Sequence, residues 1–150
     1  MYTIKRLGIE SLNSILALEK LCFSAADCWK EEDWRELLED ERAVYYAMTD
    51  GDKLIGNVFI YNWKGEDDYV KIMNVSVHPD YRKQGAAHLL MNHAAEEMQN
   101  IGMFRFRGET RSTNKAMQNV FEDCGYKLDR VEEGYYHDPE ESAWKYLLQL

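Results

Sequence analysis

Residues 82–88 have the composition of an anion-binding turn at the start of a helix: Arg82, Lys83, Gln84, Gly85, Ala86, Ala87 and His88. They lie between a segment rich in β-branched residues, which predicts a strand, and the segment 86–100, whose apolar residues recur at helical spacing. The first turn of a helix has backbone N–H groups without partners in the helix, and the helix dipole favours negative charge there. Gly85 and Ala87 leave room for a phosphate against the backbone. The turn therefore predicts a phosphate or diphosphate site, although it has neither the P-loop spacing nor the dinucleotide glycine fingerprint.

Glu109 is the second group that could do chemistry. Residues 103–108 alternate apolar and basic side chains, which predicts a strand that turns Phe104 and Phe106 toward a core, and Glu109 follows it. A carboxylate at this point could take a proton from an amine, directly or through water. It could instead form a structural salt bridge, which is the more common outcome for such a residue, with Arg105, Arg107 or Arg111.

The elements that must position these groups follow from apolar periodicity. Helical spacing predicts helices at 12–22 with Ser11 as N-cap, at 29–39, at 86–100 ending at Gly102, and between Thr113 and Gly125. Alternating and β-branched runs predict strands at 2–6, 43–48, 53–63, 69–77, 103–108, 126–131 and 142–150, the last two joined by an acidic, aromatic loop. The pattern predicts one α/β (α+β) domain over residues 1–150, with a mixed, largely antiparallel sheet.

The composition restricts the class of protein. The chain has 150 residues, 18 Lys and Arg against 27 Asp and Glu, and a formal net charge of −9 without a basic stripe, so nucleic acid is not an expected partner. Charges interrupt every apolar run, so no membrane span is expected. The odd set of three cysteines and an N-terminal sequence without an apolar core predict a reduced, cytoplasmic protein.

Several motifs in order resemble the GNAT-type N-acetyltransferases. The acetyl-coenzyme A signature of that family is Arg or Gln, two residues, Gly, one residue, then Gly or Ala, and Arg82, Gly85 and Ala87 match it. The segment 109–114, Phe121 and the pair Gly125 and Tyr126 follow the second half of the family pattern. The arrangement is most similar to the ribosomal-protein-alanine N-acetyltransferase subgroup, which also has counterparts of Trp29, Tyr135 and Tyr136.

The resemblance implies a fold and a co-substrate. It implies a mostly antiparallel central sheet of about six or seven strands flanked by about four helices, and acetyl-CoA as co-substrate without a metal. The backbone of Val75, Ser76 and Val77 would pair with the pantetheine arm as an added strand would. Residues 83–88 would hold the diphosphate, with Arg82 adding positive charge beside them. Asn114 would donate its amide to the pantetheine, unless it only caps the following helix.

The resemblance also implies catalytic roles, with two departures. Glu109 lies where the subgroup has its general base, but Phe121 replaces the tyrosine that protonates the departing thiolate. Tyr126, Tyr135 and Tyr136 are the candidate substitutes, the last two being better placed in the late loop. Lys71 stands where the subgroup often has a glutamate. With a lysine there, Glu109 would have no catalytic partner on the neighbouring strand.

We therefore expect an N-acetyltransferase, a monomer or homodimer, that acetylates a primary amine, most simply a protein N-terminus. Acidic runs after the first helix and in the late loop favour a basic peptide or an ammonium group as acceptor. Two alternatives stay open from the sequence. One is an acetyltransferase for a small cationic amine such as a polyamine or an aminoglycoside. The other is an acyl-CoA-binding module without activity, because Phe121 and Lys71 depart from the catalytic pattern.

Overall fold

The computed structural model describes residues 2–150, which form one seven-stranded sheet in the order β1-β2-β3-β4-β5-β7-β6. The strands are β1 Tyr2–Leu7, β2 Ala43–Asp50, β3 Lys53–Trp63, β4 Tyr69–Val77, β5 Arg105–Arg111, β6 Lys127–Tyr136 and β7 Glu141–Gln149. The α-helices are α1 Leu12–Cys22, α2 Glu31–Leu38, α3 Ala86–Asn100 and α4 Lys115–Asp123. All strand pairs are antiparallel except β4 with β5. The predicted mixed, mostly antiparallel sheet with flanking helices is confirmed.

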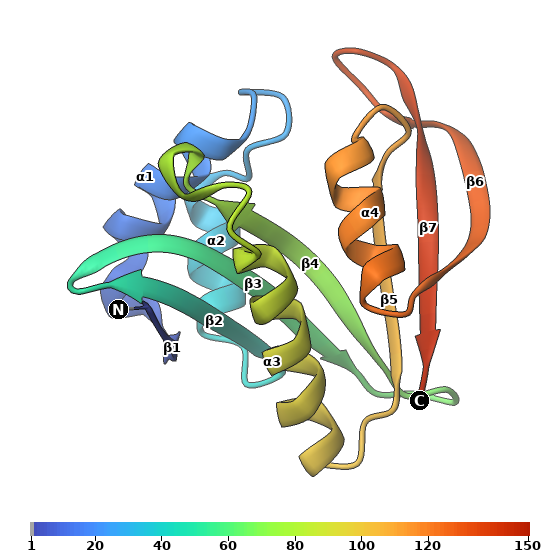
Figure 1. Ribbon diagram of the computed structural model, residues 1–150, viewed down its shortest axis with the longest axis horizontal. Helices are drawn as coiled ribbons and strands as arrows, with labels where there is room; N and C mark the ends of the chain where they lie inside the picture. Colours follow the sequence, from blue (N-terminus) through green and yellow to red (C-terminus); the bar gives the residue numbers. More distant parts are fainter. Residues whose placement is uncertain (1) are drawn as a thin grey trace.

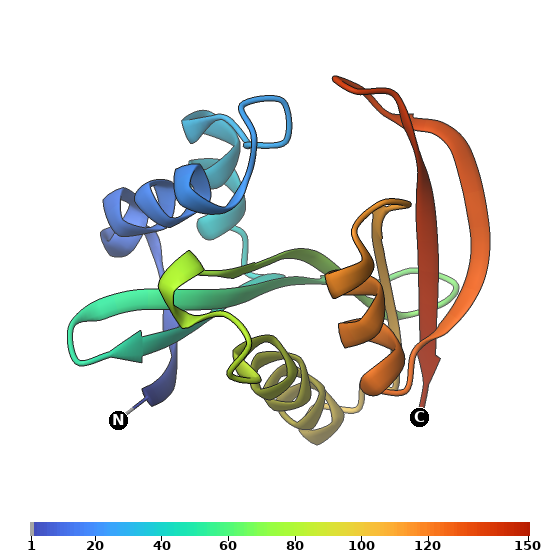
Figure 2. The ribbon, with the colours of Figure 1, turned by 45° about the horizontal axis from the view of Figure 1, so that its top comes forward.

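The sheet separates two hydrophobic cores. On one face, α1 and α2 cover the first strands and enclose Trp34, Tyr45 and Phe59. On the other face, α3 and α4 pack over the middle of the sheet, with Leu90 and Phe121 buried among strand residues. Figures 1 and 2 show the two helix pairs on opposite sides of the sheet. Both faces of β3 and β4 are therefore covered, which explains their nearly continuous apolar sequences.

The parallel pair β4–β5 is short, and the two strands separate beyond it. The two strands pair only at Val70 with Phe106 and at Lys71 with Arg107. Beyond that point they diverge, as Figure 1 shows, whereas β3 stays paired with β4 as far as Val77. Met73 of β4 has no partner on β3 at the register shift, which is the geometry of a β-bulge. One edge of β4 from about residue 72 to 77 thus lacks a neighbouring strand.

Ser11 is the N-cap residue of α1, as predicted, but it ends a short 3-10 helix and its side chain makes no capping hydrogen bond within residues 2–150. Two local predictions are wrong. Phe104 is 46% exposed, because the chain enters β5 only at Arg105 and the buried Met103 takes the place in the core. Tyr135 belongs to the end of β6, not to a loop, and only residues 137–140 connect it to β7.

None of the helices within residues 2–150 has the length and apolar character needed to cross a bilayer.

Candidate functional site

The N-terminus of α3 opens into a cavity of about 460 Å³. Gly85 is its N-cap and has φ +78°, a left-handed conformation that glycine adopts without strain. A Cβ built at Gly85 would meet nothing within 4 Å, so the space in front of this backbone is open. Lys83 also has a positive φ, +64°. The arrangement turns the free N–H groups of the first turn of α3 toward an open cavity, as an anion site requires.

Most of the residues predicted to bind the diphosphate lie together here. The cavity is lined by Arg82, Lys83, Gly85, Ala86, Ala87 and His88, and also by Val75, Ser76 and Val77. Gln84 is the exception: it does not line the cavity, and its side chain accepts a hydrogen bond of 2.8 Å from Tyr2. His88 contacts Asp123 at 2.9 Å and so ties α3 to α4 at the rim.

The open edge of β4 continues the site from this cavity. The N–H of His78 donates to Ile55 on β3, so by alternation along the strand Val75 and Val77 turn their backbone groups to the open side. Ser76 turns its backbone toward β3. The Val77 carbonyl already accepts from Arg82 Nε at 3.0 Å and from the Cys22 thiol at 3.4 Å. Of the three residues predicted to pair with pantetheine, Val75 offers both backbone groups and Val77 its N–H.

A second cavity, of about 380 Å³, adjoins the first and leads to Glu109. The two share lining residues from α1, β4 and α4: Cys22, Phe23, Val75, Asn114 and Met117. Asn114 caps α4 by accepting from the Met117 N–H at 3.1 Å, and its amide nitrogen makes no hydrogen bond within residues 2–150. The capping prediction is correct, and the same side chain keeps a donor at the junction of the two cavities.

Glu109 lies at the end of this run, paired with Lys71 of β4. The sequence suggested Arg105, Arg107 or Arg111 as the salt-bridge partner of Glu109, but the partner in the structure is Lys71. The expectation that Lys71 deprives Glu109 of a partner on the neighbouring strand is wrong, because the lysine itself is that partner. Burial favours the neutral acid, but Lys71 and the hydroxyl of Tyr135 outweigh burial and hold the pKa of Glu109 below its ordinary value.

The three tyrosines differ in their access to Glu109. Tyr136 lines the second cavity together with Glu109, and Tyr135 contacts the Glu109 carboxylate. Burial, together with the negative charge of Glu109, raises the pKa of both tyrosines. Tyr126 is buried at 4% exposure and packs on Phe121, with ring centroids 5.1 Å apart, so it does not reach the cavity.

Phe121, at the position where the sequence resemblance implies a tyrosine, packs inside the protein. Its ring is 1% exposed and stacks on Tyr146 at 4.9 Å. A Cβ built at Gly108 would lie 2.6 Å from this ring, so Gly108 is required for the ring to pack against β5. Phe121 still forms part of the wall of the second cavity, where it contributes an apolar surface.

Arg111 joins the two loops beside this cavity, an arrangement that the sequence analysis missed. Its guanidinium donates to both carboxylate oxygens of Asp27, at 3.0 and 2.7 Å, in the loop between α1 and α2. It also donates to the carbonyls of His137 and Pro139, each at 2.8 Å, in the loop between β6 and β7. Tyr136 lies under the guanidinium at 4.7 Å. No sequence signal could have identified this link, because its partners are 84 and 26–28 residues away.

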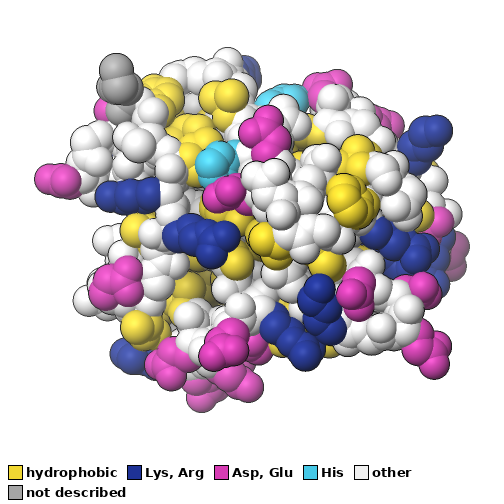
Figure 3. All heavy atoms as spheres, turned by 90° about the horizontal axis from the view of Figure 1, so that it is seen from below, with side chains coloured by type: hydrophobic (Ala, Val, Ile, Leu, Met, Phe, Trp, Pro, Cys, Tyr) yellow, Lys and Arg dark blue, Asp and Glu magenta, His cyan; other side chains and the backbone are white. Residues whose placement is uncertain are grey.

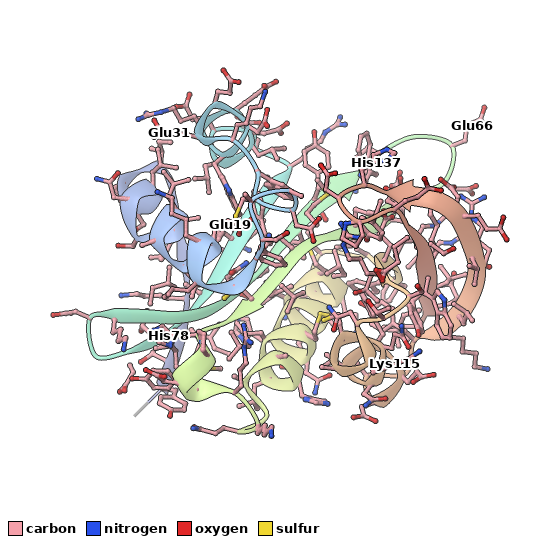
Figure 4. All side chains as sticks on the ribbon, turned by 90° about the horizontal axis from the view of Figure 1, so that it is seen from above. Glu19, Glu31, Glu66, His78, Lys115 and His137 are labelled. Carbon is pink, nitrogen blue, oxygen red and sulfur yellow. The ribbon has the colours of Figure 1, made fainter. Side chains whose placement is uncertain are left out.

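A buried polar network supports the bulge in β4, and it too was missed. Glu19 of α1 is 3% exposed and accepts from the Asn74 amide at 3.2 Å. The Asn74 oxygen in turn accepts from Asn57 at 3.0 Å and from Ser76 at 3.1 Å. Glu19 lies between α1 and the strands (Figure 4). Burial raises its pKa to about 7, against the opposing effect of the Asn74 hydrogen bond.

The chain is similar to proteins of known or assigned function. It is 26% identical over 141 residues, covering 93% of this chain and 90% of the relative, to a Bacillus subtilis protein named putative [ribosomal protein bS18]-alanine N-acetyltransferase. The crystal structure of the ribosomal-protein-S18-alanine N-acetyltransferase from Escherichia coli superimposes with a TM-score of 0.86 and 25% identity, covering 99% of this chain and 94% of that one. A chain of the NatC complex bound to Gag peptide and CoA has the same fold, with a TM-score of 0.87 at 24% identity over 99% and 98% of the two chains.

A family model also matches most of the sequence. The match covers residues 12–126, from α1 to the residue before β6, and so includes the anion-binding turn, the open edge of β4 and Glu109. The model is that of the acetyltransferase (GNAT) family. The chain belongs to the acetyltransferase (GNAT) family and is an acetyl-CoA-dependent acetyltransferase.

Proposed function

We propose that this acetyltransferase transfers an acetyl group from acetyl-CoA directly to the α-amino group at the N-terminus of a protein. The observation that carries the proposal is the position of Glu109. Glu109 lines the cavity that is reached from the α3 N-terminus, and it also lines a third cavity, which residues of β4, β5, β6 and β7 enclose. A base in that position can meet an amine that approaches the acyl carbon from the side opposite to coenzyme A. The name of the Bacillus subtilis relative supports a protein N-terminus as acceptor.

The residues along the cleft fit acetyl-CoA. The diphosphate would lie against the first turn of α3 at Gly85, with Arg82 and Lys83 beside it. The pantetheine arm would follow the open edge of β4, with the backbone of Val75 and the amide of Asn114 as partners. Bound acetyl-CoA supplies the activated acyl group.

Glu109 would take the proton that the amine loses, and its low pKa favours an α-amino group. An α-amino group has a pKa of about 8 and a lysine side chain about 10.4, so deprotonating the lysine costs about 3 kcal/mol more. A carboxylate whose pKa is held below its ordinary value is a weak base. Such a base suits an α-amino group better than a lysine side chain, because the α-amino group loses its proton more readily.

Tyr136 would donate the proton to the departing thiolate, because it lines the same cavity as Glu109. The thiolate needs little help from a proton donor. A thiol has a pKa of about 8.5, so leaving as the thiolate at pH 7 costs only about 2 kcal/mol relative to the thiol. We therefore expect Tyr136→Phe to lower turnover about tenfold rather than abolish it.

The test compares acceptors in an assay of thiol release, with products located by mass spectrometry. The purified protein and acetyl-CoA are incubated with peptides that have a free N-terminus, the same peptides with a blocked N-terminus and an internal lysine, and a polyamine. We expect acetylation of the free α-amino groups, and a rate at least a hundredfold lower in Glu109→Gln. Acetylation confined to lysines or to the polyamine would contradict the proposal.

The alternative of an acyl-CoA-binding module without activity is excluded, because the chain belongs to the acetyltransferase (GNAT) family and is an acetyl-CoA-dependent acetyltransferase.

A further inference from the structure

The third cavity, of about 340 Å³, has a positive lining in a negatively charged protein. Four of its lining side chains are basic and two are acidic: Lys71, Arg107, Arg130 and Lys145 against Glu109 and Asp129. These residues come from β4, β5, β6 and β7, on the part of the sheet that α1 and α2 leave uncovered. Figure 3 shows that the face seen from below carries both acidic and basic side chains.

The strand register places these like charges side by side. Lys71 pairs with Arg107 across β4 and β5, and Arg130 pairs with Lys145 across β6 and β7. Like charges directly opposite each other destabilise a sheet. Glu109, which lies opposite Lys145 across β5 and β7, offsets part of this repulsion.

The carboxylates of the protein neutralise only part of this charge. Lys71 pairs with Glu109, and Lys145 pairs with Glu132 at 3.2 Å. Arg107 lies over the Tyr69 ring at 4.7 Å, and neither it nor Arg130 forms an ion pair within residues 2–150. Two guanidinium groups thus border the cavity without a carboxylate partner, and guanidinium groups bind carboxylates through paired hydrogen bonds.

We propose that this cavity binds an acidic side chain of the acceptor, at residue two or three of the acceptor chain, counting the residue with the reactive α-amino group as residue one. The inference rests on the proposed function, because it places that amino group at Glu109. Arg107 and Glu109 are two residues apart on one face of β5, about 7 Å along the strand. An extended peptide advances by about the same amount in two residues. Arg130 lies in the same row of the sheet as Glu109, beyond Lys145 of β7, so an acceptor with its amine at Glu109 has Arg107 along β5 and Arg130 across the sheet from it.

This preference is opposite to the one expected from the acidic runs. Three of those carboxylates form pairs in the structure. Glu31 pairs with Arg35 at 3.0 Å, and Glu132 pairs with Lys145. Glu141 accepts from the Thr113 N–H at 3.0 Å and lies 3.6 Å from Arg111. The charge nearest to Glu109 is positive, so a polyamine or a lysine-rich segment would be repelled there.

The test uses peptides that begin with alanine and differ only at residues two and three, which are glutamate, glutamine or lysine. For the unaltered protein we expect kcat/KM to be about tenfold higher for the glutamate peptide than for the glutamine peptide, and lowest for the lysine peptide. Raising the salt concentration from 50 to 500 mM should remove most of the difference. Arg107→Gln and Arg130→Gln should each reduce the glutamate preference about threefold.

Arg105→Gln is the matched control, because Arg105 lies on the same face of β5 but lines none of the three cavities and contacts Asp67 at 3.9 Å. The Arg105→Gln variant should prefer the glutamate peptide to the same extent as the unaltered protein. Arg107→Glu, if folded by circular dichroism, should move the preference toward the lysine peptide. Equal kcat/KM for the three peptides, or a preference for lysine in the unaltered protein, would refute this inference and leave the proposed function intact. Failure to acetylate any of the three peptides at the α-amino group would refute the proposed function and this inference together.

Discussion

At the scale of single residues, Gly85 and Gly102 provide a matched pair. They lie at the two ends of α3 with φ values of +78° and +86°, and a Cβ at either would meet nothing within 4 Å. Alanine at either position should therefore cost a similar conformational strain, about 1 kcal/mol of stability. Only Gly85 faces the cavity that would hold the diphosphate.

We predict that Gly85→Ala weakens acetyl-CoA binding about tenfold, because relief of the strain would turn the N–H groups of the first turn away from the diphosphate. Gly102→Ala should lower the melting temperature to the same extent and leave the affinity unchanged. Isothermal titration with acetyl-CoA and thermal unfolding measure the two effects. Equal affinities in the two variants would contradict the assignment of the anion site.

The raised pKa of the buried Glu19 carboxyl group leads to a second prediction at the scale of single residues. Because burial raises its folded-state pKa from 4.5 to about 7, the folded protein binds a proton that the unfolded chain has already lost between these two pH values. The stability that this group contributes is therefore fully present below about pH 4.5 and is lost as the pH rises through about 7.

Glu19→Gln cannot ionise, so its free energy of unfolding should improve relative to the unaltered protein as the pH rises from 5 to 8. The shift should reach at most about 3 kcal/mol. Urea unfolding at a series of pH values measures it. Parallel stability curves for the two proteins would show that the Glu19 carboxyl titrates normally.

At the scale of elements, Arg111 holds together the loops 23–30 and 137–140 on either side of the second cavity. We predict that Arg111→Ala raises KM for a peptide acceptor about tenfold and speeds hydrogen exchange in both loops, because a partly buried charged pair is lost. Acetyl-CoA affinity should change little. The exposed Arg35→Gln is the control, since within residues 2–150 Arg35 forms an ion pair only with Glu31 of the same helix. Unchanged exchange in Arg111→Ala would show that other contacts fix the loops.

The elements also show where sequence reasoning succeeds and where it stops. Strand β4 and helix α3 were predicted with their observed bounds, because β-branched runs, helical spacing and Gly102 are local signals. Strand β6 was predicted to end at 131 and ends at Tyr136, because it is an edge strand exposed on both faces and so lacks an alternating apolar pattern. The Lys71–Glu109 pair joins residues 38 apart, and only the short parallel pairing of β4 and β5 brings them together.

At the scale of the whole molecule, the divergence of β4 from β5 determines where the parts of the candidate site lie. Pairing that ends at Lys71 and Arg107 opens a cleft through the sheet. The N-terminus of α3 lies along one side of it and Glu109 on the other, while the loops joined by Arg111 border the second cavity beside Glu109. Figures 1 and 2 show this separation between the half of the sheet with α1 to α3 and the half with β5 to β7. The central claim is that acetyl-CoA and the acceptor amine meet in this cleft at the same time.

The most direct measurement of that claim is the affinity of a conjugate in which the sulfur of coenzyme A is joined through an acetyl group to the α-amino group of a short peptide. If both substrates occupy the cleft together, the conjugate should bind at least a hundredfold more tightly than either part, because linking makes the second binding event intramolecular. Gly85→Ala and Arg111→Ala should each weaken it. A conjugate that binds no more tightly than coenzyme A alone, or that is insensitive to Arg111→Ala, would contradict the account.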